Sequence, residues 1–112
     1  FSPICSPLNC PWGHKTLGNY LGAGRDSWAQ YDTVALVAKA TEHLPVLVDQ
    51  GEADNFLDEQ LKTSLLIEAA KHAGFPMDIR MQPEYDHSYF FIATFIGEHM
   101  AFHARALGAS KA

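Results

Sequence analysis

The sequence predicts an α/β fold in which parallel strands alternate with helices. Residues 45–50 form a short apolar, β-branched run, which is typical of a parallel strand buried on both faces. Residues 77–82 alternate between apolar and polar side chains, as in a strand with one exposed face. Helical periodicity separates and follows these two runs. Residues 44–112 are therefore expected to fold as strand, helix, strand, helix.

Composition limits the class of protein. The chain has 112 residues, which suits one modest domain, and it is 47% hydrophobic and 19% charged, as expected for a packed globular fold. Its formal net charge is −5, and its 8 basic residues are scattered, so we expect no nucleic-acid partner. We see no apolar run that would cross a membrane and no secretory leader, and we expect a cytoplasmic protein.

The first part of the chain, residues 1–43, is predicted to be an insertion of loops and short helices. Prolines at positions 3, 7 and 11 favour an irregular surface loop through residue 13. Within it, Trp12 is equally suited to cover a core edge or to form a pocket wall. Cys5 and Cys10 are too few for a disulfide framework or a four-ligand metal site, and whether they pair stays open.

Three short helices are expected after this loop. A weak helix over residues 14–21 is stopped by the glycines of the segment 22–24. Asp26 or Ser27 is placed to cap a second helix through Tyr31, at the longest to Ala35. Asp32-Thr33 is placed to cap a third helix over residues 34–40.

Residues 44–112 carry the strands and the longer helices. Gly51 ends the first strand, a polar loop covers residues 52–56, and apolar side chains spaced by four predict a helix from Asp58 to residue 73. The second strand leads into a loop over residues 83–87. A last helix over residues 89–107 follows, and Gly108 and the tail 109–112 end it.

The chain is expected to be an incomplete part of a larger domain. It begins at Phe1, inside what resembles a strand end, with no start signal before it. Two or three strands bury their faces poorly, so a sheet of this size is marginal. We therefore expect further strands upstream of residue 1.

Asp54 and His87 are the candidate catalytic residues. Each lies in a loop that follows a predicted strand, and open α/β sheets build their sites past the carboxyl ends of such strands. Position alone favours a turn or capping role for Asp54 and an exposed or capping role for His87. Their joint placement, acid before histidine, instead matches two thirds of a hydrolase triad. Asp49 and Glu52 are weaker candidates for the acid.

The sequence gives weaker evidence for a metal site and none for a nucleophile within this chain. His99 and His103 share a helix face at a spacing that can bind zinc, but the pattern His-Glu-x-x-His and a third ligand are both missing, so surface or part-buried histidines are favoured. None of the serines lies in Gly-x-Ser-x-Gly, the turn that exposes a nucleophilic hydroxyl. Ser88 is expected to cap the last helix, and the nucleophile is expected upstream of Phe1.

Several segments together resemble the S-formylglutathione hydrolase (esterase D) family. They are residues 3–5, Asn-Cys-Pro-Trp-Gly at 9–13, 19–22, 49–57 and Tyr-Asp-His-Ser-Tyr with the following residues at 85–96. The resemblance covers nearly the whole chain but only the C-terminal portion of the family. It implies the C-terminal part of an α/β-hydrolase fold, with Asp54 as triad acid, His87 as triad base and Trp12 near the active site.

The resemblance also implies a function. Family members are cytosolic, often dimeric serine thioesterases that hydrolyse S-formylglutathione to glutathione and formate in formaldehyde detoxification, act on simple esters and need no metal or organic cofactor. Because the family's serine turn and oxyanion hole precede the matching region, this chain alone is expected to be inactive. The alternative is a non-catalytic fragment or truncated paralogue that acts as a protein-interaction module through an exposed sheet edge.

Overall fold

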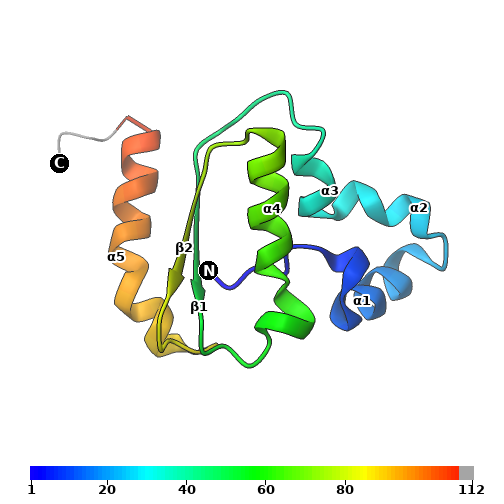
Figure 1. The fold of residues 1–112 in the computed structure, drawn as a ribbon, viewed down its shortest axis with the longest axis horizontal. Helices are drawn as coiled ribbons and strands as arrows, with labels where there is room; N and C mark the ends of the chain where they lie inside the picture. The colour runs from blue at the N-terminus through cyan, green and yellow to red at the C-terminus, as the bar shows by residue number, and fades with distance from the viewer. Residues whose placement is uncertain (109–112) are drawn as a thin grey trace.

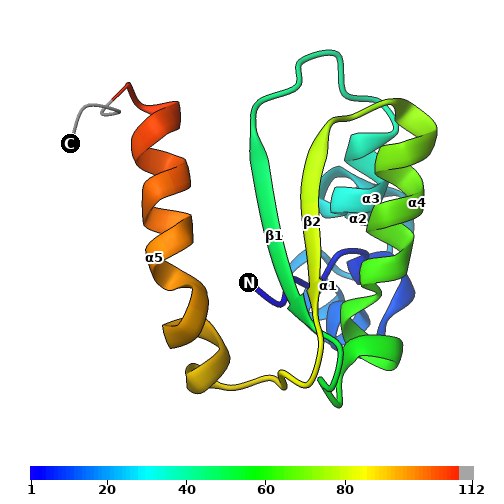
Figure 2. The same cartoon turned by 60° about the vertical axis from the view of Figure 1, so that its left-hand side comes forward.

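A computed structural model describes residues 1–108 as three layers, with a small sheet between one long helix and a group of other helices (Figure 1). Helix α5 (Tyr89–Ala106) covers one face of the sheet, and α4 (Thr63–Ala73) covers the other. Three shorter helices lie beside α4, namely α1 (Pro11–Leu21), α2 (Arg25–Trp28) and α3 (Thr33–Val37). The same layers are visible after rotation (Figure 2). The predicted tail 109–112 lies outside the described residues.

The sheet consists of two parallel strands in the described part of the chain. Strand β1 (Val46–Gly51) pairs with β2 (Met77–Gln82), and the register runs from Val46 opposite Met77 to Gly51 opposite Gln82. Helix α4 (Thr63–Ala73) connects the two strands, so the predicted strand, helix, strand order is confirmed. Both loops that leave the strands therefore meet at the same edge of the sheet.

The apolar core lies between the sheet and helices α3 and α4. It is built from small and aliphatic side chains that face one another across these elements, namely Cys5, Val37, Val48, Leu66 and Ala70. Met77 and Ile79 of β2 pack against this cluster, as the alternating pattern of β2 predicts. The opposite face of the sheet carries Asp49, Arg80 and Gln82, and α5 covers it through His99.

The N-terminal segment differs from the predicted surface loop. Helix α1 (Pro11–Leu21) begins three residues before the predicted start, because a proline at the first helical position loses no hydrogen bond. The thiol sulfur of Cys10 caps it by accepting from the N–H of Gly13. A 3₁₀ turn (Pro7–Asn9) precedes α1, and Cys5 and Cys10 are buried. This segment is therefore part of the packed structure.

The short helices that follow α1 are only partly as predicted. The second predicted helix forms as α2 (Arg25–Trp28) and a 3₁₀ turn (Ala29–Tyr31), and α3 (Thr33–Val37) ends three residues early. Asp32 caps α3 as predicted, since its Oδ1 accepts from the N–H of Ala35 at 2.9 Å. Its Oδ2 accepts from the hydroxyl of Ser6 at 2.7 Å, which ties α3 to the N-terminal segment.

The predicted continuous helix from Asp58 is wrong. The chain forms one π-helical turn (Leu57–Leu61), and Lys62 then adopts a left-handed conformation (φ 56°) before α4 begins at Thr63. This break buries Leu61 and Thr63 on either side of Lys62, which a straight helix would not do. Periodicity alone did not reveal it, because Leu61 and Leu65 keep helical spacing across the break.

Helix α5 (Tyr89–Ala106) is close to its predicted length. Ser88 caps it as predicted, because its hydroxyl accepts from the N–H of Phe91 at 3.4 Å. Gly108 follows the helix end with a positive φ of 84°. None of the helices formed by residues 1–108 has the length and apolar character needed to cross a bilayer.

Candidate active site

The loops that follow β1 and β2 are fastened to each other through their backbones. The N–H of Glu52 donates to the carbonyl of Gln82 at 2.9 Å, and the N–H of Ala53 donates to the carbonyl of Tyr85 at 3.0 Å. Gly51 lies so close to Tyr85 that any Cβ at this position would overlap the Tyr85 carbonyl. The two loops therefore hold a fixed relative position, and each carries one candidate residue.

Asp54 has a carboxylate that is buried and held on both oxygens. Oδ1 accepts from the backbone N–H of Phe56 at 2.8 Å, a local turn that Asp commonly makes. Oδ2 accepts from His87 Nδ1 at 2.9 Å and from Gln50 Nε2 at 3.1 Å. The acid is thus oriented before any substrate arrives.

His87 combines a fixed ring with access to solvent. Its side chain is 41% exposed, whereas the Asp54 side chain that it meets has no exposed surface. Because the carboxylate can only accept, Nδ1 carries the proton, and proton transfer by this ring would run through Nε2. The ring also borders a cavity of about 410 Å³, which is lined by Phe1, Ser2, His87, Ser88, Tyr89 and Ile92. An accessible histidine beside a buried acid can move a proton to and from a bound molecule.

Trp12 lies one aromatic ring away from His87. The centroid of its ring is 4.7 Å from that of Phe56, which in turn meets the ring of His87 edge to face at 5.2 Å. The side-chain oxygen of Gln60 accepts from the backbone N–H of Trp12 at 2.9 Å and fixes the start of α1 beside this site. Trp12 does not line the cavity beside His87, so its pocket role stays a prediction.

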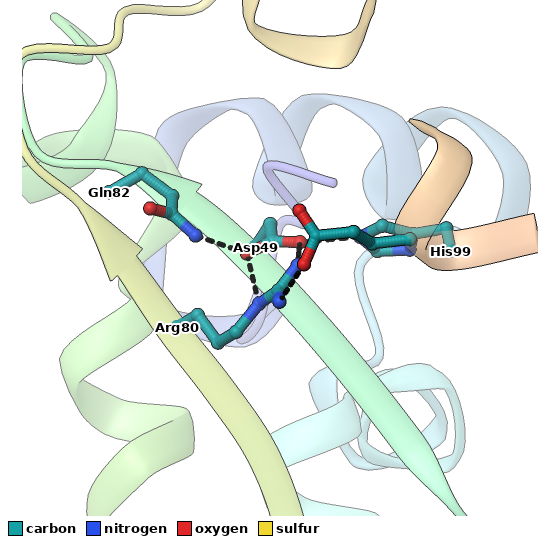
Figure 3. A network of polar contacts seen from close by, with 5 residues as sticks. Asp49, Arg80, Gln82 and His99 are labelled. Carbon is teal, nitrogen blue, oxygen red and sulfur yellow. Dashed lines mark hydrogen bonds and ion pairs between the residues drawn. The ribbon is translucent and has the colours of Figure 1, made fainter. Parts of the chain in front are cut away.

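Asp49 binds a different histidine from the one that meets Asp54. Its carboxylate is fully buried and accepts from Arg80, from Gln82 and, at 2.6 Å, from His99 Nε2 (Figure 3). Burial by itself would raise the pKa of Asp49, but the hydrogen bonds from Arg80, Gln82 and His99 outweigh it and hold that pKa below its usual value. This network joins α5 to both strands, so Asp49 does not compete for His87.

The structure also places the remaining candidate metal ligands and the two cysteines. No group of three or more His, Cys, Asp or Glu residues suited to a metal occurs between residues 1 and 108. His99 is buried, with 7% exposure, more deeply than the surface or part-buried position expected for it, and His103 packs against Phe102. Cys5 and Cys10 are both free and buried. Burial raises the pKa of Cys5 to about 11, which keeps its thiol protonated and poorly nucleophilic.

Two residues of the site escaped the sequence analysis. Gln50 contacts the Asp54 carboxylate, and Phe56 contacts it through its backbone and His87 through its ring. Gln50 did carry a signal, because a polar residue at the end of an apolar strand needs a buried partner. Phe56 carried none, since its role depends on a turn that the sequence does not specify.

An acid and a histidine past the ends of successive parallel strands, in that order along the chain, define the arrangement of α/β hydrolases. Comparison with known proteins agrees with this class. Residues 1–102 match the Esterase family model, described as "Putative esterase", and the chain belongs to this family.

Two relatives show how the chain compares with longer proteins. It is 46% identical over 108 residues to an S-formylglutathione hydrolase of Arabidopsis thaliana, covering 96% of this chain and 38% of that protein. The solved structure of an S-formylglutathione hydrolase from Agrobacterium tumefaciens superimposes with a TM-score of 0.89 at 42% identity, covering 96% of this chain and 39% of that one. The described residues thus have part of an α/β-hydrolase fold, and the chain spans less than two fifths of either relative.

Proposed function

We propose that the polypeptide to which this chain belongs is a serine thioesterase that hydrolyses S-formylglutathione to glutathione and formate. The observation that supports this most is the 2.9 Å hydrogen bond from His87 Nδ1 to the buried Asp54 carboxylate. Two relatives that are 42–46% identical carry the name of this enzyme, which agrees with the proposal. In this proposal residues 1–43 form an insertion, and residues 44–112 supply the acid and the base.

The proposed mechanism follows from the geometry of the two side chains. His87 Nε2 takes the proton of a serine hydroxyl as that oxygen attacks the thioester carbonyl, and then returns it to the leaving thiolate. Asp54 keeps the ring in the Nδ1-protonated tautomer and stabilises its charged form during the attack. Water then repeats the cycle on the formyl-enzyme, so no metal or organic cofactor is needed for any step.

The serine and the oxyanion hole are assigned to a preceding part of the same hydrolase. The exposed apolar side chains of α5 support a partner of this kind. They include Tyr89, Phe90, Ile96 and Met100, and an apolar helix face of this size is usually covered in a complete fold. We further propose a cytoplasmic location and a possible homodimer, in keeping with the family resemblance.

The test is carried out on the complete polypeptide with S-formylglutathione and p-nitrophenyl acetate. His87→Ala should lower kcat by roughly 10⁴-fold or more, because the proton transfer loses its base. His72→Ala, at an exposed position of α4, is the matched control and should leave kcat unchanged. Near-normal turnover by His87→Ala would refute the assignment.

A second measurement separates the enzyme from the alternative, a non-catalytic interaction module. Residues 1–112 alone should be inactive towards p-nitrophenyl acetate, because the nucleophile is assigned to another part of the polypeptide. Activity of this segment alone would place the nucleophile within it. A complete polypeptide that folds, binds another protein and hydrolyses neither substrate would favour the interaction module.

A further inference from the structure

Gln50 is a buried polar residue whose amide is held at both ends. It lies at the end of β1 with no exposed surface, and Thr63, the first residue of α4, is 1% exposed. The Gln50 nitrogen Nε2 donates to Asp54 Oδ2 and to the carbonyl of Gly51, both at 3.1 Å. Its oxygen Oε1 accepts from the Thr63 hydroxyl at 3.2 Å. A buried hydrogen-bonded path thus runs from α4 to the proposed triad acid.

These contacts determine which way the Gln50 amide faces. The nitrogen meets two groups that can only accept, the Asp54 carboxylate and the Gly51 carbonyl. A flipped amide would press its oxygen against both of them, and a buried acceptor without a donor is unfavourable. The Thr63 hydroxyl adds a donor on the other side and so favours the observed orientation. Thr63 thereby presents the Gln50 N–H to Asp54.

The Gln50 N–H acts on the same carboxylate oxygen that His87 uses. Asp54 Oδ2 accepts from both side chains, and Oδ1 is occupied by the backbone N–H of Phe56. Three donors therefore fix the plane of a carboxylate that is out of contact with water. Without the Gln50 donor, only the Phe56 N–H on Oδ1 and the His87 ring itself would hold the carboxylate, so Oδ2 would be fixed less firmly towards His87.

We propose that Gln50 is a positioning residue for the Asp54–His87 pair and that Thr63 sets the orientation of its amide. The inference rests on the proposed function and assigns no contact with substrate to either residue. Its consequence is a defined tautomer: with Asp54 held, His87 keeps its proton on Nδ1 and leaves Nε2 free to accept one. With Asp54 loosened, the tautomer protonated on Nε2 becomes populated, and that tautomer cannot act as a base.

Two replacements of similar shape test this in the complete polypeptide. Gln50→Met removes the donor while keeping the chain length, and it should lower kcat roughly 10- to 100-fold, the range expected for one hydrogen bond to a charged group. KM should stay unchanged because Gln50 is buried. Thr63→Val removes the hydroxyl and should lower kcat less, whereas Thr63→Ser keeps the hydroxyl and should retain wild-type kcat.

A second measurement does not depend on activity. Long-range ¹H–¹⁵N NMR spectra of the His87 ring distinguish the two neutral tautomers, and Gln50→Met should shift the population from the Nδ1-protonated form towards the Nε2-protonated form. A purely structural role would lower stability in urea and leave this ratio unchanged. If Gln50→Met does not fold, Thr63→Val against Thr63→Ser provides the same comparison.

The outcomes separate this inference from the proposed function. An inactive wild-type polypeptide would refute the thioesterase, while the tautomer ratio would still test the positioning role. An active wild type with unchanged kcat and unchanged tautomer ratio in both Gln50→Met and Thr63→Val would overturn the inference and leave the thioesterase in place. A fall in kcat together with a shifted ratio would support both.

Discussion

Replacement of Arg80 by methionine tests how the buried carboxylate of Asp49 is kept in the fold. The Arg80 guanidinium donates to both carboxylate oxygens, from Nε at 2.8 Å and from Nη2 at 2.5 Å. Methionine keeps most of the aliphatic stem and removes these two donors. Asp49 would then remain fully buried with only Gln82 and His99 to stabilise its charge (Figure 3).

The expected cost follows from the burial of Asp49. Removing one partner of a buried ion pair typically costs about 3–5 kcal/mol, because the remaining charge is left without compensation. The same guanidinium also pairs with Glu98, whose side chain is 55% exposed. A surface pair of this kind contributes about 0–1 kcal/mol, so Glu98→Gln is the matched control and should cost less than about 1 kcal/mol.

The assay is urea unfolding of the complete polypeptide, followed by circular dichroism. Arg80→Met should lower the free energy of unfolding by several times the loss caused by Glu98→Gln. Asp49→Asn combined with Arg80→Met should cost less than the sum of the two single changes, because the neutral amide no longer needs the guanidinium. Equal losses for Arg80→Met and Glu98→Gln, or strictly additive single changes, would refute the reasoning.

Three further predictions concern acid stability, loop contact and thiol reactivity. The fold lowers the pKa of Asp49, so the stabilising effect of its carboxylate is present above the unfolded pKa of about 3.9 and is lost as pH falls through the folded pKa. Asp49→Asn should therefore flatten the acid side of a plot of unfolding free energy against pH. Gly51→Ala should destabilise the protein and separate the two loops, since its Cβ would overlap the Tyr85 carbonyl. At Gly97 in α5 a Cβ meets open space, so Gly97→Ala should be neutral or stabilising by up to about 1 kcal/mol in the same urea titration. Cys5, with its pKa raised to about 11, should resist iodoacetamide at pH 8 until urea unfolds the protein, as followed by mass spectrometry; fast labelling of the native state would contradict its burial.

The parts of the fold that depend on local pattern were predictable from the sequence. Alternation of side chains located β2 at residues 77–82, and the apolar run located β1 within one residue at each end. The cap residues Asp32 and Ser88 were also identified, because a side-chain oxygen before a helix has a specific local role. Parallel pairing then brought Asp54 and His87 together, as their positions after successive strands predict.

The parts that depend on distant contacts were not predictable. Lys62 interrupts a regular apolar pattern because the burial of its neighbours requires a turn, and no local signal marks that turn. The histidine partner of Asp49, His99, lies 50 residues away on α5, so only the folded structure identifies it. Helix α1 begins earlier than predicted. Prolines favour loops in general, but the first helical position tolerates Pro11.

Residues 1–108 contain two carboxylate–imidazole pairs, and this bears on how such pairs are recognised in other structures. The His99–Asp49 pair is the closer one, at 2.6 Å against 2.9 Å for His87–Asp54. A search ranked by interatomic separation would therefore select the pair that is sealed inside the protein. Only the ring of His87 retains enough open surface, 41% of its side chain, to reach a molecule arriving from outside. Solvent access, considered after distance, separates the pair proposed to be reactive, His87–Asp54, from the buried pair His99–Asp49.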